Sequence, residues 1–228
     1  MTVCIAALAD NNKKVYVISD CMISLNAPLP YQYETKDVPK IIGLTDNCVI
    51  MIAGNTVFGN EIATLSQNGI ESGRPYSVEE IANEVLKAYR SYRLKLIEDA
   101  VLAPRQLTLS EYKEKQQTLN QEVVNSIENA LTTTNIEVDI IVAGSDTTGC
   151  HIYTLTHPGI MLSFDSIGYA CVGIGAPHAQ LHFIDNDYTK KLSIENVKVL
   201  VGEAKKKSEN APGVGKQSLD LVLPKEEK

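Results

Sequence analysis

The order of short apolar runs along the chain is the feature that most constrains its fold. Runs rich in β-branched residues come first, then helical spacing, then more such runs, two further helical stretches and one last run. This order differs from the strict strand–helix alternation of a parallel doubly wound sheet. It predicts an α+β fold in which two antiparallel sheets have helices outside. The expected strands are 2–9, 14–20, 38–43, 47–53, 137–144, 149–155, 160–164, 167–173 and 217–223.

Turn-forming residues separate several of these runs. Asp10–Lys13 joins the first two runs, and Asp146–Gly149 joins a later pair, so both pairs are predicted to be hairpins. Residues 21–37 hold Pro28, Pro30 and few periodic apolar positions, which indicates a loop.

Helical spacing is strongest in the middle of the chain. Two capping boxes, Ser77–Glu80 and Thr108–Glu111, predict long helices at about 77–102 and 109–133, separated at Pro104. Further helices are expected at 56–68, 176–187 and 193–209. The length of 228 residues fits one domain, 1–228, with a helical insertion at about 98–133.

Composition excludes several classes of function. The chain has 28 acidic and 21 basic residues, which argues against a nucleic-acid partner. Five scattered cysteines and the isolated pair His178 and His182 give no metal-ligand pattern, and Gly173–Pro177 lacks the third glycine of a dinucleotide fingerprint. We therefore expect no metal and no cofactor. Since neither a signal peptide nor an apolar stretch of about 20 residues is visible, we expect a cytoplasmic protein without a membrane partner.

The start of the chain suggests a nucleophile. Thr2 follows Met1, and a threonine at the amino terminus carries a hydroxyl nucleophile and a free α-amine on one residue. The amine has an ordinary pKa near 8, so it can act as the base around neutral pH. Removal of Met1 is therefore expected, although a small second residue is common and means little by itself.

Three strand ends supply matching groups. Asp20 ends the second run, and antiparallel pairing with the first run would place it beside Thr2. Lys40 begins the third run, where an ammonium held by an aspartate would lower the pKa of a nearby hydroxyl. Gly54 ends the fourth run, and its amide can donate to an oxyanion.

The segments that carry Thr2, Asp20, Lys40 and Gly54 follow one another in this order along the chain. In that order they resemble the proteasome β-subunit family of N-terminal nucleophile hydrolases and its bacterial self-compartmentalising relatives. The resemblance covers about 2–72 and 136–223. Its motifs are Met1-Thr-Val-Cys, Val17-Ile-Ser-Asp20, Val38-Pro-Lys-Ile-Ile, Ile52-Ala-Gly-Asn-Thr56, Ile140–Tyr153 and Ala170–Pro177.

This resemblance implies a four-layer α-β-β-α sandwich and a homo-oligomeric ring acting on peptides or unfolded proteins. Whether an unfoldase partner exists stays open. It also implies that Thr2, Asp20, Lys40 and Gly54 form the catalytic set. Ser24 would bind the substrate backbone, and Ile52 would line the pocket for the residue before the cleaved bond.

The chain also departs from the family pattern. Ile174, Asn210 and Gly213 stand near positions where the family has a supporting serine, aspartate and serine. The hydrogen-bond network around Thr2 is therefore expected to be thinned or replaced.

The favoured function is a threonine-type peptidase. Two alternatives keep the same nucleophile: acyl transfer to an amine, and amide hydrolysis on a small molecule. A third is an inactive ring or scaffold subunit.

Overall fold

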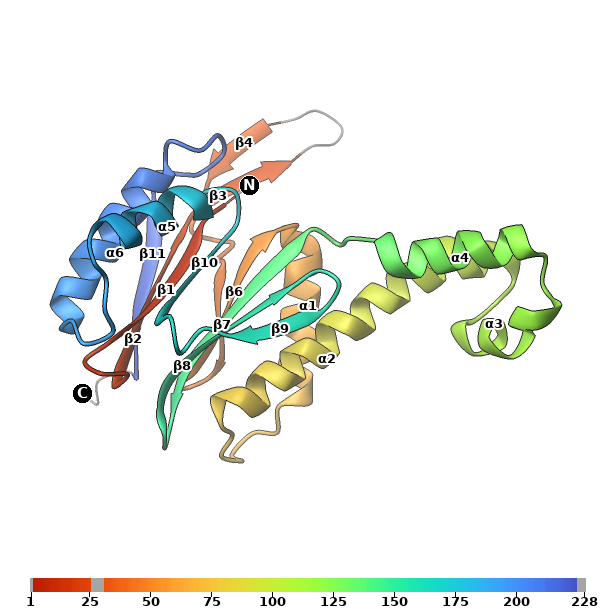
Figure 1. The fold of residues 1–228 in the computed structure, drawn as a ribbon, viewed down its shortest axis with the longest axis horizontal. Coiled ribbons are helices and arrows are strands. Elements are labelled where there is room, and N and C mark those ends of the chain that lie inside the picture. The colour runs from red at the N-terminus through yellow and green to blue at the C-terminus, as the bar shows by residue number, and fades with distance from the viewer. Residues whose placement is uncertain (1, 26–30, 225–228) are drawn as a thin grey trace.

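The computed structural model of the chain describes residues 2–25 and 31–224. Within these ranges the protein is a mixed α+β fold whose strands form three antiparallel sheets. Two of the sheets stand face to face in the body of the molecule, and a helical arm extends from it (Figure 1). The prediction of an α+β fold with antiparallel sheets is confirmed.

The first large sheet has the strand order β10-β1-β2-β11. Its centre is the hairpin of β1 and β2, joined at the turn 10–13, in which Asp10, Asn11 and Asn12 adopt positive φ as Asn and Asp tolerate. The strands are β1 (Cys4–Ala9), β2 (Lys14–Asp20), β10 (Tyr169–Val172) and β11 (Ser218–Leu223).

The second large sheet has the order β5-β6-β7-β8-β9. Its central strands are buried on both faces, so they read as continuous apolar runs rather than as alternating patterns. The strands are β5 (Ile41–Thr45), β6 (Cys48–Gly54), β7 (Val138–Asp146), β8 (Gly149–Thr156) and β9 (Ile160–Ser163).

Three apolar clusters hold the layers together. One packs α5 (Ala176–Asp185) and α6 (Ile194–Ser208) against the first sheet. Another packs α1 (Thr56–Gly69) and α2 (Val78–Ile97) against the second sheet. The third lies between the two sheets, so each large sheet is covered on both faces.

The arm corrects the prediction of one long helix over 109–133. After α2 the chain continues through a π-helical turn (Glu98–Leu102) and a 3₁₀ turn (Ala103–Arg105), then α3 (Leu109–Lys115), a 3₁₀ turn (Gln116–Thr118) and α4 (Gln121–Thr133). The predicted helix is broken because Asn120 caps a new one, its side chain accepting from the amide of Glu122. The arm has its own small core around Leu102, Tyr112 and Ile127.

A second correction concerns residues 21–37, which the sequence predicted to be a loop. Strands β3 (Met22–Leu25) and β4 (Tyr31–Glu34) pair as an antiparallel hairpin there. Tyr31 and Tyr33, two residues apart on β4, stack with ring centroids 5.8 Å apart. Pro28 and Pro30, which suggested the loop, lie outside the described residues.

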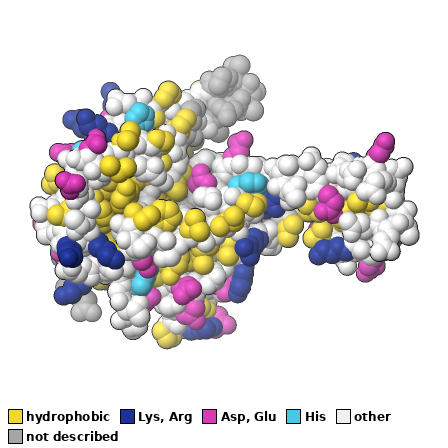
Figure 2. Space-filling view, in the orientation of Figure 1, with side chains coloured by type: hydrophobic (Ala, Val, Ile, Leu, Met, Phe, Trp, Pro, Cys, Tyr) yellow, Lys and Arg dark blue, Asp and Glu magenta, His cyan; other side chains and the backbone are white. Residues whose placement is uncertain are grey.

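Hydrophobic side chains are also found on the surface. Figure 2 shows them as a band across the face that it presents. Exposed apolar residues on or beside β9, β10 and α5 include Ile160, Leu162, Ile167, Ile174, Leu181 and Ile184. Among the described helices, none combines the length and apolar character needed to cross a membrane.

Candidate active site

The β1–β2 pairing brings the start of the chain against Asp20, as predicted. The register pairs Cys4 with Ser19, so Thr2 lies beside the end of β2. Thr2 Oγ1 donates to Asp20 Oδ1 at 2.6 Å, and the Val3 amide donates to the same oxygen at 2.9 Å. The Asp20 amide in turn donates to the Val3 carbonyl at 3.2 Å.

Lys40 reaches the same point from the segment before β5, in the other sheet. Its Nζ contacts Thr2 Oγ1 directly and lies 2.8 Å from Asp20 Oδ1. The Ile52 amide donates to the Lys40 carbonyl at 2.9 Å, which fixes the lysine backbone against β6. The hydroxyl, carboxylate and ammonium groups therefore share one buried point between the sheets.

The charge on Asp20 is stabilised from several sides. Its second oxygen, Oδ2, accepts from the amides of Met22 at 3.1 Å and Gly215 at 3.0 Å. Burial by itself favours the neutral acid, but Lys40 and the hydrogen bonds from Thr2 and Gly215 outweigh it and hold the pKa of Asp20 below its ordinary value.

A glycine turn holds the Thr2 backbone. The Gly175 amide donates to the Thr2 carbonyl at 3.2 Å, and Ser208 Oγ donates to the Gly175 carbonyl at 3.0 Å. Gly173 has φ +93°, and a Cβ there would lie 2.5 Å from the Thr2 carbonyl oxygen, so only glycine fits. Ile174, between the two glycines, is exposed.

Gly54 lies at the exposed end of β6, at the same end of the strands as Thr2 and Lys40. The buried Cys4 Sγ contacts the Ile52 carbonyl at 3.4 Å, which joins the start of β1 to the end of β6. Gly54 has φ +102°, and a Cβ there would lie 1.9 Å from the Glu137 carbonyl oxygen. The backbone therefore requires glycine at this position.

The two residues expected to bind substrate are placed differently. Ile52 is buried and packs against Gly59 of α1, where an added Cβ would lie 2.2 Å from Ile52 Cγ2. Ser24 is on β3, opposite Gln32, and its buried Oγ has no hydrogen-bond partner. Neither residue forms a hydrogen bond with Thr2 in the described part of the chain, so their roles stay predictions.

Cysteine chemistry does not compete with Thr2. All five cysteines are free and buried. Burial is the largest cause that raises the pKa of the Cys4 thiol to about 12, and it also raises the pKa of Cys21. Because the thiolate is the reactive form, these two neighbours of the site are inert around neutral pH.

Sequence reasoning missed the groups that support the site from the α6–β11 segment. Asn210 and Gly213 were singled out there, but the donor to Asp20 is the Gly215 amide, and Ser208 supports the glycine turn. The two glycines of the run Gly213-Val-Gly215 were a usable sequence signal for a crowded backbone. In the structure, a Cβ at Gly215 would lie 2.4 Å from Glu34 Oε1.

An open groove of about 1400 Å³ lies at the other end of the strands, around the β5–β6 and β7–β8 turns. Its lining includes Arg74, Asp146 and His151 but none of Thr2, Asp20, Lys40 and Gly54. We place the candidate site at Thr2, since the interacting reactive groups are there. No group of three or more His, Cys, Asp or Glu suited to a metal occurs in residues 2–25 and 31–224.

The chain was compared with protein families and with curated proteins. No protein-family model matches the chain. A search of curated proteins finds no significant match.

Proposed function

We propose that this chain is a threonine-type peptidase of the proteasome β-subunit kind, with Thr2 as its nucleophile. The observation that carries the proposal is that the Thr2 hydroxyl contacts both Asp20 and Lys40 in a buried site. A hydroxyl beside an ammonium ionises more readily, and the carboxylate keeps that ammonium charged and oriented. The three residues come from two sheets, so the fold must form before they meet.

The proposed reaction begins when the peptide bond before Thr2 is cut, which frees the α-amine. The amine takes the hydroxyl proton, and Oγ1 forms a bond to the carbonyl carbon of the substrate. The electron pair of the carbonyl moves to its oxygen, where the Gly54 amide donates to the oxyanion. The carbon–nitrogen bond then breaks, and the leaving amine takes the proton from the α-ammonium.

The product of this first half is an ester between Thr2 and the substrate acyl group. Water gives a proton to the α-amine and attacks the ester carbonyl, and a second tetrahedral oxyanion forms. Its collapse returns the proton to Oγ1 and releases a carboxylic acid. Lys40 stays charged throughout, and Asp20 holds it in place.

The arrangement of layers supports the same proposal. Helices α5 and α6, the two large sheets, and helices α1 and α2 are joined by three successive apolar clusters. We propose that this is the four-layer α-β-β-α sandwich of N-terminal nucleophile hydrolases, with the arm inserted between α2 and β7.

The surface supports a proposed ring assembly. Leu181 and Ile184 lie three residues apart on α5 and are 58% and 65% exposed. Ile174, just before the helix, is also exposed, so the outer face of α5 presents three large apolar side chains among polar ones. We propose that a second copy of the chain covers this face.

Covalent labelling tests the proposed nucleophile. The purified protein is weighed by mass spectrometry, incubated with a peptide vinyl sulfone, and weighed again with peptide mapping. We expect a mass without Met1 and one adduct on Thr2. Thr2→Ala should abolish the adduct, whereas Thr2→Ser should keep it because the hydroxyl is retained.

Peptide cleavage by the same variants completes the test. An adduct that survives Thr2→Ala contradicts the assignment. A folded protein with a free Thr2 and neither an adduct nor cleavage would be the inactive ring subunit. Adding an amine nucleophile and analysing the products separates acyl transfer from hydrolysis.

A further inference from the structure

Lys205 is buried although it belongs to a run of three lysines. It lies in the last turn of α6, where its neighbours Lys206 and Lys207 are exposed, yet only 4% of its own surface is accessible. Lysine is almost never buried unless its charge is paired. A buried ammonium at this position therefore needs specific hydrogen-bond and charge partners.

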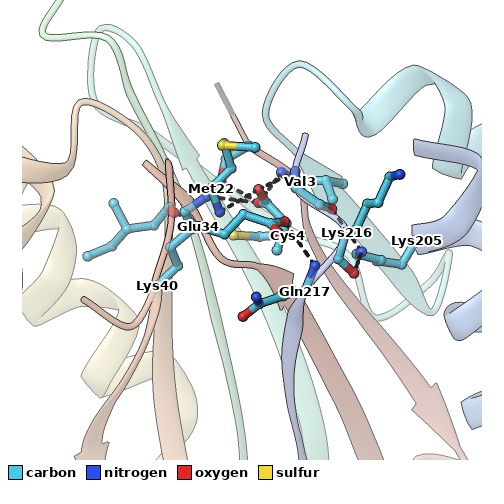
Figure 3. Close-up of polar contacts among 12 residues, drawn as sticks. Val3, Cys4, Met22, Glu34, Lys40, Lys205, Lys216 and Gln217 are labelled. Atoms are coloured by element: carbon cyan, nitrogen blue, oxygen red, sulfur yellow. Dashed lines mark hydrogen bonds and ion pairs between the residues drawn. The ribbon is translucent and has the colours of Figure 1, made fainter. Parts of the chain in front are cut away.

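Those partners use all three protons of the ammonium. Nζ donates to Glu209 Oε1 at 2.6 Å, to the Gly215 carbonyl at 2.9 Å and to the Lys216 carbonyl at 2.6 Å. Figure 3 shows Lys205 and Lys216 on one side of the close-up and Lys40 on the other. The lysine thus ties the end of α6 to the segment that leads into β11.

Gly215 of that segment contacts the candidate site. Gly215 accepts from Lys205 through its carbonyl, and its amide donates to Asp20 Oδ2 at 3.0 Å. On the far side, the Gln217 amide donates to Glu34 Oε1 at 2.9 Å. Gly215 is therefore held between a buried cation and the carboxylate that contacts Thr2 and Lys40.

We infer that Lys205 is a positioning residue for the site, because it fixes the Gly215 amide against Asp20. Its functional consequence rests on the proposed peptidase function, since Asp20 orients Lys40 and Thr2. Lys205 fills, by a different route, the supporting role that Asn210 and Gly213 do not show.

Loss of the Lys205 ammonium would have a definite chemical consequence. Without the ammonium, two carbonyls and the Glu209 carboxylate lose their shared donor, and the Gly215 amide is no longer held in place. Asp20 then loses a hydrogen bond that favours its charged form. Its pKa should rise, and the orientation of Lys40 toward Thr2 should loosen.

The experiment compares wild type with Lys205→Met, using the exposed neighbour Lys206→Met as the matched control. The first readout is the titration of the Asp20 carboxyl, followed by NMR in protein labelled with ¹³C-aspartate. Lys205→Met should raise the pKa of Asp20 and Lys206→Met should leave it unchanged. An unchanged Asp20 titration in folded Lys205→Met overturns the inference, whether or not the protein is a peptidase.

The second readout is the rate of Thr2 labelling as a function of pH. In Lys205→Met the acid limb should move to higher pH, and the plateau rate should fall roughly tenfold, which equals about 1.4 kcal/mol. Lys205→Arg should restore part of the rate because it keeps the charge and donors. If wild type is not labelled at all, the proposed function fails, and the Asp20 titration still decides the role of Lys205.

Lys205→Met leaves Glu209 with an unpaired charge, which by itself can prevent folding. The double variant Lys205→Met/Glu209→Met removes both charges and keeps the apolar volume. It should fold, and its Asp20 titration should match that expected for Lys205→Met. A double variant that folds with the wild-type titration also overturns the inference.

Discussion

Asp20 is the residue on which most of the site's interactions meet. One oxygen contacts Thr2, Lys40 and the Val3 amide, and the other accepts from the amides of Met22 and Gly215. The same contacts that orient the reactive groups therefore also join β1, β2, β3 and the α6–β11 segment. A change at this residue should affect stability and chemistry together.

Asp20→Asn is expected to destabilise the fold because Lys40 would stay buried without its partner. Breaking a buried ion pair by removing one member costs about 3–5 kcal/mol in unfolding free energy. Urea unfolding measures this loss. Asp20→Asn/Lys40→Met should recover much of the stability but none of the Thr2 labelling, whereas a single variant that unfolds at the wild-type urea concentration contradicts the assignment.

Stability should also depend on pH through Asp20. Its folded-state pKa is below the unfolded value of about 3.9, since Lys40 and the hydrogen bonds outweigh burial. The stabilisation is therefore present above the unfolded pKa and is lost as the pH falls through the folded pKa. Urea midpoints from pH 7 down to 3 should drop more steeply in wild type than in Asp20→Asn/Lys40→Met. Parallel curves would argue against this role.

The thiol of Cys4, close to Thr2, should be unreactive in the folded protein. Burial raises the pKa of Cys4 to about 12, and Cys4 Sγ faces the Ile52 carbonyl. At pH 8 the native protein should react with iodoacetamide only as fast as it opens, whereas in urea all five cysteines should react. Cys4→Ala should keep the Thr2 adduct. Rapid native alkylation of Cys4, or loss of the adduct in Cys4→Ala, would point to the thiol instead.

Among the helices and strands, the sequence predicts those that are marked by residues close together in the chain. The Ser77 and Thr108 capping boxes both form, and the helix expected at 193–209 begins after the N-cap Ser193. The β1–β2 hairpin follows from its turn residues, and that pairing alone brings Asp20 to Thr2. These features depend on residues a few positions apart, so spacing in one sequence is enough to find them.

The missed features depend on contacts between distant residues. Strand β4 is exposed along most of its length, so no alternation of buried and exposed positions marks it in the sequence. The support of Asp20 by Gly215 spans 195 positions. The burial of Lys205 inside a lysine run has no local signal either, because only the fold decides which of three lysines turns inward.

The arm gives a prediction at this scale. Its core contains the fully buried Ile127, and removing side-chain carbons from such a position costs about 2–5 kcal/mol. Ile127→Ala should speed hydrogen exchange in α3 and α4 while Thr2 labelling stays unchanged. The control, Ile50→Ala in the body, should speed exchange in the sheets. If Ile127→Ala speeds exchange in the sheets equally, the arm is part of the same cooperative unit.

For the whole molecule, the site is a product of how the sheets stack. Thr2 precedes β1 and Asp20 ends β2 of the first sheet, whereas Lys40 precedes β5 and Gly54 ends β6 of the second. Only face-to-face packing of the sheets therefore brings them to the same end of the strands. The open groove of about 1400 Å³ at the opposite end of the strands lacks this convergence of groups. The candidate site is therefore placed by its interacting side chains and not by cavity size.

The outer face of α5 carries the last prediction. If a second copy covers it, wild type should appear in native mass spectrometry at a multiple of the chain mass. Leu181→Asp/Ile184→Asp places two charges in that contact and should dissociate the assembly, because buried unpaired charges are costly. Val57→Asp on α1 is the control, since Val57 is 66% exposed and lies on the opposite layer. If the assembly survives the double variant but dissociates in Val57→Asp, the contact lies on the α1 side. If wild type is monomeric at every concentration, no second copy covers the outer face of α5 and the proposal is wrong.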